Sequence, residues 1–253
     1  MNRFAANAVG VAAVLFGGGS LVLLGGFLLF GSFGFIRFSA TDAQVLLWDA
    51  GLSLLFFIQH SGMVRRSFRT WLDPLLARSF HAAVYALASG LVLVTVLLFW
   101  QPSATVLWAL PAPFRLWSRL FFALAVAGFI WGTRSLRDFD TFGLAPLRVR
   151  PDDRPPPAPR FMVRGPYLWV RHPLYLFVIV FIWAGPDVTA DRLLFNGLWT
   201  AWIVLGARWE ERDLVAAFGA AYRRYQATVP MLLPWRGPAG RRLTDGNGDG
   251  IGP

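Results

Sequence analysis

The chain has 253 residues, of which 56% are hydrophobic and 16% aromatic, and its mean hydropathy is +0.50. This composition excludes an ordinary soluble domain and predicts a polytopic membrane protein, because the apolar residues fall in long blocks. All 24 basic residues are arginine, the formal net charge is +10, and cysteine is absent, which excludes disulfides and thiolate metal sites. The arginines lie between the apolar blocks, as membrane orientation requires, so nucleic-acid binding is not expected.

About six membrane-spanning helices are expected. A crossing needs about 20 apolar residues, and the first four blocks reach that length. The first of them is too long for the core of a signal peptide and is expected to be an uncleaved span. The last two blocks are short and predict a tilted or shallow hairpin. The expected spans cover about residues 5–36, 43–63, 79–100, 116–136, 173–184 and 193–209.

A cytoplasmic amphipathic helix is expected after the sixth span, from Glu210 to Val229-Pro230. Its apolar residues recur at helical spacing: Leu214, Phe218, Tyr222 and Tyr225. The predicted fold class is therefore all-α, a polytopic membrane bundle with one appended helix. We expect a four-span region at 1–136, a region carrying the functional site at 137–236, and a disordered tail at 237–253.

The distribution of arginine predicts the orientation in the membrane. With both termini in the cytoplasm, twenty arginines lie in the inside segments and four outside, namely Arg37, Arg115, Arg119 and Arg192. The sequence therefore predicts an integral protein of the bacterial inner membrane with both termini and the functional site in the cytoplasm.

Two polar elements are candidates for a site. One is the turn Gly165-Pro166-Tyr167-Leu168-Trp169-Val170-Arg171-His172-Pro173-Leu174-Tyr175, and the other is the pair Glu210 and Glu211, the only glutamates in the chain. If the fifth and sixth spans form a hairpin, both elements return to one face. Each element also has a plain structural explanation, because the turn suits a membrane entry and the glutamates suit a salt bridge with a neighbouring arginine.

Other polar residues give weaker signals. His60, beside Gln59, suits either polar packing inside the bundle or a place in a functional site. The tyrosines of the tail helix, including Tyr222, suit packing or ligand binding. No metal site is expected, since the acidic run Asp245-Gly246-Asn247-Gly248-Asp249-Gly250 lacks the closing glutamate of a calcium loop.

Taken together, the turn and the segment from Glu210-Glu211-Arg212-Asp213-Leu214 to Val229-Pro230 resemble the signature of the isoprenylcysteine carboxyl methyltransferase superfamily, which also includes phospholipid methyltransferases. Upstream pieces, Phe57-Ile58-Gln59-His60-Ser61-Gly62-Met63 and Phe139-Asp140-Thr141-Phe142-Gly143-Leu144, are similar to the narrower group of bacterial membrane methanethiol S-methyltransferases and NnrU-type proteins. The resemblance covers most of residues 40–235. It departs at Phe177, where the superfamily usually has glycine.

The resemblance implies the cofactor S-adenosyl-L-methionine and a set of site residues. The residues implied to surround the cofactor are Tyr167, Arg171, His172, Pro173, Tyr175, Glu210, Glu211 and Tyr222, and those implied for catalysis are Glu211, Arg208 and His60. Carboxylates suit the cationic groups of this cofactor, while Arg171 or His172 suits its carboxylate or ribose. Arginine also favours ionisation of a thiol, for which Arg134, Arg137, Arg164 and Arg208 are candidates.

The implied function is methylation of a small thiol, methanethiol to dimethyl sulfide, by a membrane enzyme. The partners are a small or lipid-soluble substrate and the lipid bilayer, and the oligomeric state is not readable from the sequence. Two alternatives stay open: a lipidic carboxylate or amine as acceptor, and a non-catalytic accessory protein of the NnrU type. A membrane reductase using NADPH is weaker, because no glycine-rich dinucleotide loop is present.

Overall fold

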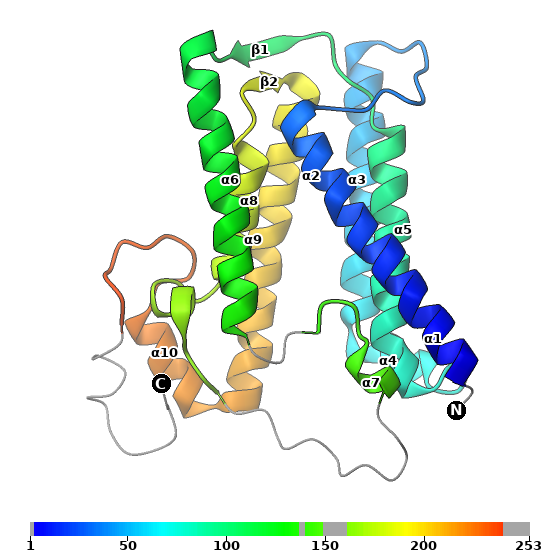
Figure 1. Ribbon diagram of the computed structural model, residues 1–253, viewed down its shortest axis with the longest axis vertical. Helices are drawn as coiled ribbons and strands as arrows, with labels where there is room; N and C mark the ends of the chain where they lie inside the picture. Colours follow the sequence, from blue (N-terminus) through cyan, green and yellow to red (C-terminus); the bar gives the residue numbers. More distant parts are fainter. Residues whose placement is uncertain (1–2, 137–139, 149–160, 240–253) are drawn as a thin grey trace. The chain divides into compact units, whose positions relative to one another are not determined.

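The computed structural model describes residues 3–136, 140–148 and 161–239, and Figure 1 shows that helices dominate it. Several of these helices continue one another along the chain, as α1, η1 and α2 do over Arg3–Phe30. In chain order the elements are α1 (Arg3–Ala12), η1 (Ala13–Gly18), α2 (Gly19–Phe30), α3 (Asp42–Val64), α4 (Arg66–Leu72), η2 (Arg78–Phe80), α5 (His81–Phe99), β1 (Val106–Ala109), α6 (Ala112–Ser135), α7 (Ala145–Arg148), η3 (Gly165–Leu168), α8 (Pro173–Trp183), β2 (Asp187–Thr189), α9 (Ala190–Phe218) and α10 (Ala220–Thr228).

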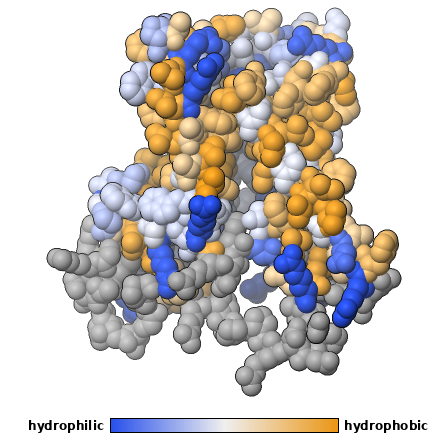
Figure 2. Space-filling model, in the orientation of Figure 1, coloured by the Kyte–Doolittle hydropathy of each residue, from blue (hydrophilic) through white to orange (hydrophobic). Residues whose placement is uncertain are grey.

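Four helical segments within the described residues are long and apolar enough to cross a membrane: Arg3–Phe30, Asp42–Val64, Arg78–Phe99 and Ala112–Ser135. Their outward side chains are largely apolar, and hydrophobic residues cover much of the visible face in Figure 2. A surface of this kind is stable in lipid but not in water. The predicted all-α membrane bundle is therefore confirmed.

The predicted C-terminal hairpin differs from the structure in its second helix. α8 ends at Trp183 as expected, with only 11 residues, but α9 has 29 residues and continues well past residue 209. Glu210 and Glu211 therefore lie inside α9 and do not begin a new helix. The predicted amphipathic helix is divided at Gly219, whose φ of 56° ends α9 and starts α10.

The chain forms two compact units. Unit 1 comprises the described parts of Met1–Ala112, Asp140–Arg154 and Gly185–Trp199, and unit 2 those of Pro113–Phe139, Pro155–Ala184 and Thr200–Pro253. These units are interleaved along the chain, and the predicted functional division at residue 136 stays a prediction.

Unit 1 contains the first three long helices and a two-stranded ribbon that the sequence did not suggest. β1 pairs antiparallel with β2, with Trp108 opposite Val188. Next to the ribbon, the buried carboxylate of Asp191 accepts hydrogen bonds from the Trp100 indole and the Ser103 N–H, both at 3.0 Å. Because a buried carboxylate needs such donors, Asp191 fixes the start of α9 against the end of α5.

Unit 2 contains α6, α8, the second part of α9, η3 and α10. Small residues of α6 face bulky residues of α8: a side chain at Gly128 would overlap the ring of Phe177, and a Cβ at Gly132 would lie 2.6 Å from Leu174. The ring of Phe177, where the superfamily usually has glycine, thus lies against α6. Packing extends beyond the predicted boundary at residue 236, since Ala239 is 1% exposed, and the rest of the predicted tail, 240–253, lies outside the described residues.

Candidate functional site

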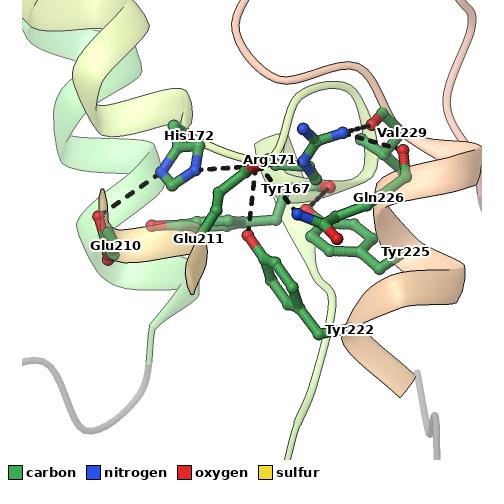
Figure 3. A network of polar contacts seen from close by, with 9 residues as sticks. All are labelled: Tyr167, Arg171, His172, Glu210, Glu211, Tyr222, Tyr225, Gln226 and Val229. Carbon is green, nitrogen blue, oxygen red and sulfur yellow. Dashed lines mark hydrogen bonds and ion pairs between the residues drawn. The ribbon is translucent and has the colours of Figure 1, made fainter. Parts of the chain in front are cut away.

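The turn before α8 is built by glycine and proline. Gly165 has a φ of 56°, and a Cβ there would meet Ser135 and Trp131 of α6, so the position requires glycine. Pro166 then opens the short helix η3, and Pro173 occupies the first turn of α8, where the missing N–H does no harm. His172 lies directly before Pro173 with an extended φ of −122°, which turns its ring away from the helix axis toward α9 (Figure 3).

The backbone of this turn is fixed to the segment after α10. The Arg171 N–H donates to the carbonyl of Pro230 at 2.9 Å, and the His172 N–H donates to that of Met231 at 3.1 Å. The Tyr225 hydroxyl donates to the carbonyl of Tyr167 at 2.6 Å. The turn is therefore held between α10 and the residues that follow it.

Glu211 is the centre of the polar network in Figure 3. Its Oε1 accepts from Arg171 Nε at 2.5 Å and from the Tyr222 hydroxyl at 3.5 Å, and lies 3.3 Å from His172 Nε2. Its Oε2 accepts from Gln226 Nε2 at 3.0 Å. Four side chains, two from the turn and two from α10, thus meet one carboxylate that is only 12% exposed.

Arg171 joins this carboxylate to the end of α10. Besides the bond to Glu211, one terminal nitrogen donates to the carbonyls of Gln226 at 3.0 Å and Val229 at 2.5 Å. Its side chain is 10% exposed. Because its donors point in fixed directions, Arg171 locks α9, the turn and α10 into one arrangement.

Glu210 differs from Glu211 in exposure and contacts. Its side chain is 45% exposed, and its Oε2 lies 3.6 Å from His172 Nδ1. The two nitrogens of the buried His172 ring therefore face two carboxylates, while the ring plane stacks on Tyr175 at a centroid distance of 5.4 Å. A carboxylate can accept about four hydrogen bonds, so Glu210 retains capacity for a cationic ligand.

The electrostatics of the cluster favour a neutral His172 ring beside an ionised Glu211. Burial lowers the pKa of His172 below its ordinary 6.5, against the raising effect of Glu210 and Glu211. Burial raises the pKa of Glu211, but the hydrogen bonds and charge of Arg171, with Gln226 and His172, lower it further, and the net pKa lies below 4.5. Burial is also the main cause that raises the pKa values of Tyr167, Tyr222 and Tyr225.

The tyrosines of α10 serve packing as well as the network. Tyr222 and Tyr225 are 1% and 3% exposed and form one apolar cluster with Val163 and Val229. The ring of Phe161 meets both tyrosines edge-on. Tyr222 thus anchors α10 through its ring and points its hydroxyl at Glu211.

The structure brings most of the predicted site residues together and leaves others apart. Figure 3 shows six of them together in unit 2: Tyr167, Arg171, His172, Glu210, Glu211 and Tyr222. Pro173 and Tyr175 follow in the first turn of α8, where Tyr175 stacks on His172. Arg208 is exposed on α9, three residues before Glu211, and Arg134 is exposed near the end of α6. Arg137 lies outside the described residues, as does the acidic run 245–250.

His60 belongs to unit 1 and to a different cluster. Its Nε2 lies 2.7 Å from the Tyr85 hydroxyl, and its ring packs on Phe56 at a centroid distance of 5.1 Å. Gln59 donates to Ser89 at 3.3 Å, while its buried Oε1 has no hydrogen-bond partner among the described residues. The packing expected for His60 is present, and its catalytic role stays a prediction.

Sequence reasoning missed Gln226 and the backbone carbonyls that hold Arg171. Gln226 follows Tyr222 by four residues on α10, so the two side chains share one helix face. That spacing is the signal by which Gln226 could have been found. The carbonyl contacts of Val229 and Pro230 have no side-chain signal.

Comparison with known proteins places the chain in a family. A methanethiol S-methyltransferase of Pseudomonas sp. (strain GM41(2012)) is 40% identical over 197 residues, which cover 76% of this chain and 74% of the relative. The chain belongs to the methanethiol S-methyltransferase family. Another family member, from Mycobacterium tuberculosis, is 34% identical over 200 residues, 78% of this chain and 81% of the relative.

Nurim of Sus scrofa is also similar, 31% identical over 190 residues, 67% of this chain and 68% of the relative. No protein-family model matches the chain. No solved structure matches it. The predicted resemblance to the methanethiol S-methyltransferase family is confirmed, and with the apolar helices it identifies an integral membrane protein of the methyltransferase class.

Proposed function

We propose that the protein transfers a methyl group from S-adenosylmethionine to methanethiol and forms dimethyl sulfide, at the cytoplasmic face of the bacterial inner membrane. The observation that carries the proposal is the His172 ring held between Glu210 and Glu211, in a chain similar to methanethiol S-methyltransferases over three quarters of its length. The methanethiol S-methyltransferase activity named for the relatives supports the acceptor, and the carboxylates of the cluster support the cationic cofactor.

The residues fit this cofactor chemically. When bound, S-adenosylmethionine supplies a methyl group on a sulfonium centre, and the molecule also carries an ammonium and a carboxylate. Glu210, with 45% of its side chain exposed, is suited to receive a cationic group. The neighbouring His172 ring forms a stacked aromatic surface with Tyr175 beside that carboxylate.

Arg171 and Glu211 have a different role in this proposal. Both side chains are almost buried and already bonded to each other and to α10. We therefore assign them as positioning residues, which keep His172 and Glu210 in place. Fixed geometry of this kind lowers the barrier of an in-line displacement because no reorganisation is needed at the reacting atoms.

The acceptor side of the reaction needs a thiolate. Methanethiol would react as the thiolate, after its S–H proton is lost to solvent, and bound S-adenosylmethionine would supply the methyl group. A guanidinium nearby favours ionisation of the thiol. Arg208 lies one helical turn before Glu211 on α9 and is our candidate for this effect.

A methyl-transfer assay tests the proposal. The protein is purified in phosphatidylcholine vesicles and supplied with methanethiol and S-adenosylmethionine deuterated at the methyl group. Headspace mass spectrometry is expected to find deuterated dimethyl sulfide, reduced about tenfold or more in Glu210→Gln, because a charge-assisted hydrogen bond contributes about 1.5–3 kcal/mol. Asp213→Asn removes an exposed carboxylate further along α9 and is the matched control.

Other outcomes overturn parts of the proposal. Methylation of a lipidic carboxylate or amine, with methanethiol unchanged, contradicts the acceptor but keeps the methyltransferase. No methylation of any acceptor and no binding of S-adenosylmethionine favour the non-catalytic alternative.

A further inference from the structure

The segment Val229–Ala239, here called the C-terminal loop, is closed at both ends by the turn that carries the site. At its start, the N–H groups of Arg171 and His172 donate to the carbonyls of Pro230 and Met231. At its end, the Ala239 N–H donates to the carbonyl of Leu168 at 2.9 Å. Both ends of the loop are therefore fixed to one short stretch of the turn, between Leu168 and His172.

The middle of the C-terminal loop presents large apolar side chains. Leu233 is 64% exposed and Trp235 68% exposed, although Val229 and Ala239 at the two ends are 1% exposed. Arg236 follows Trp235, is exposed, and donates to the carbonyl of Ala227 at 3.1 Å. Leucine, tryptophan and arginine side by side are typical of the boundary between acyl chains and headgroups, where tryptophan concentrates and arginine reaches phosphate.

The height of the loop in unit 2 agrees with that boundary. Figure 1 shows the C-terminal loop, in red and orange, rising from the end of α10 to the level of the last turns of α6. Those turns expose Ile130 at 42% and Trp131 at 49%, and the exposed Arg134 follows them. Since α6 is one of the helices long and apolar enough to cross a membrane, its tryptophan and arginine mark the end of the apolar layer. The C-terminal loop carries the same residue types, Trp235 and Arg236, at the level of these turns.

We propose that the C-terminal loop inserts Leu233 and Trp235 into the lipid interface, with Arg236 at the phosphates. The partner is the phospholipid surface of the membrane that holds the protein. This inference does not depend on the proposed reaction. Because the base of the loop is bonded to Arg171 and His172, insertion holds the candidate site at a fixed depth beside the bilayer.

The absence of cysteine makes a depth measurement simple. Leu233→Cys and Trp235→Cys are each labelled with a nitroxide in phosphatidylcholine vesicles, and collision rates with oxygen and with a water-soluble nickel chelate are measured by electron paramagnetic resonance. We expect both positions to favour oxygen, as lipid-exposed positions do. Asp213→Cys, exposed on α9, is the control and is expected to favour nickel.

The result that overturns the proposal is a nickel accessibility at both loop positions equal to that of the Asp213 control. Dipolar broadening between labels, reduced by dilution with unlabelled protein, also overturns it, since the loop would then meet a second copy of the chain. The unfolding temperature of each labelled variant is compared with that of the parent. Two loop positions are labelled so that, if one variant does not fold, the other variant still tests the proposal.

Discussion

At the scale of single residues, the polar contacts of unit 2 converge on Glu211. A carboxylate that is 12% exposed is stable there because four side chains face it, one of them the guanidinium of Arg171. A buried ion pair contributes little net stability compared with apolar packing, but the removal of one partner leaves the other charge without compensation. Arg171 and Glu211 are therefore mutually dependent.

We predict that Arg171→Ala destabilises the protein by about 3 kcal/mol, because it leaves the Glu211 charge buried and frees the carbonyls of Gln226 and Val229. Thermal unfolding in detergent micelles, followed by fluorescence, measures the change. Arg212→Ala removes an exposed arginine one residue after Glu211 and is expected to change stability by less than about 0.5 kcal/mol. Equal losses in the two variants would contradict the account of Arg171.

The pKa shifts predict how stability depends on pH. The folded pKa of His172 is lowered below 6.5, chiefly by burial. Between that pKa and 6.5 the unfolded chain binds more protons than the folded one, so stability falls as pH drops through this window. Burial raises the pKa of Glu211, but Arg171, Gln226 and His172 together lower it more, so the net pKa lies below 4.5. The contribution of Glu211 to folding stability is therefore present above pH 4.5 and is lost as pH falls through the folded pKa.

We therefore expect His172→Gln to flatten the upper part of the pH profile, with the decline below about pH 4.5 retained, because glutamine does not titrate. Unfolding temperatures of the parent and the variant across both windows measure this. A parent profile that is flat just below pH 6.5 would contradict the pKa shift of His172.

Much of the candidate site could be predicted from residue types and order. The turn around His172 and the pair of glutamates stand out because charged residues are rare beside apolar blocks. The different exposure and contacts of Glu210 and Glu211 could not be predicted, because they depend on which side of α9 faces Arg171. The expected contact between Arg171 and a cofactor was a sequence inference; in the structure its donors hold α10.

At the scale of elements, the ends of α9 and α10 place both glutamates. The sequence predicted a new helix at Glu210, but the helix continues because glutamate, arginine and leucine are good helix formers and no glycine or proline stands between Glu210 and Gly219. The turn at Gly219 lets α10 fold back so that Tyr222 and Gln226 face Glu211. A left-handed glycine, rather than a change in polarity, sets the boundary.

We predict that Gly219→Ala destabilises the protein by about 1–3 kcal/mol, since a side chain is strained at a φ of 56°. A Cβ there would meet no atom within 4 Å, so the loss is one of backbone conformation alone. Gly206→Ala, inside α9 and equally without neighbours, is the control and is expected to cause no loss. Thermal unfolding of the two variants compares them, and an unaffected Gly219→Ala variant would contradict the turn.

The contact of α6 with α8 gives a prediction for Phe177, where the superfamily usually has glycine. Gly128→Ala places a methyl group against the Phe177 ring and is expected to destabilise by about 1–3 kcal/mol. Phe177→Ala in the same chain makes room, so the double variant is expected to lose less than the two single losses together. Additive losses would mean that the two residues do not meet. Gly51→Ala, with open space around it, controls for the substitution itself.

At the scale of the whole molecule, hydropathy and charge predicted the fold class, because long apolar blocks have few alternatives to membrane-crossing helices. The pairing of β1 with β2 escaped prediction, since Val106–Ala109 and Asp187–Thr189 are too short to give a periodic pattern. The family followed from motif order and is supported by identity over most of the chain. Orientation in the membrane stays a prediction from arginine counts.

Single cysteines in the cysteine-free chain test that orientation. Leu107→Cys lies in β1, in a connection predicted to be outside, and Arg212→Cys lies on the predicted cytoplasmic part of α9. We expect a membrane-impermeant maleimide to label Leu107→Cys in intact spheroplasts, and Arg212→Cys only after permeabilisation. The reverse pattern would place the candidate site outside the cytoplasm, where S-adenosylmethionine is not made.

The most direct test of the central claim is calorimetric titration of the protein in nanodiscs with S-adenosylmethionine. The account predicts saturable binding by the parent, binding about tenfold or more weaker in Glu210→Gln with an unchanged unfolding temperature, and parent-like binding in Asp213→Asn. Binding by Glu210→Gln as tight as that of the parent, or no binding by the parent, would contradict it.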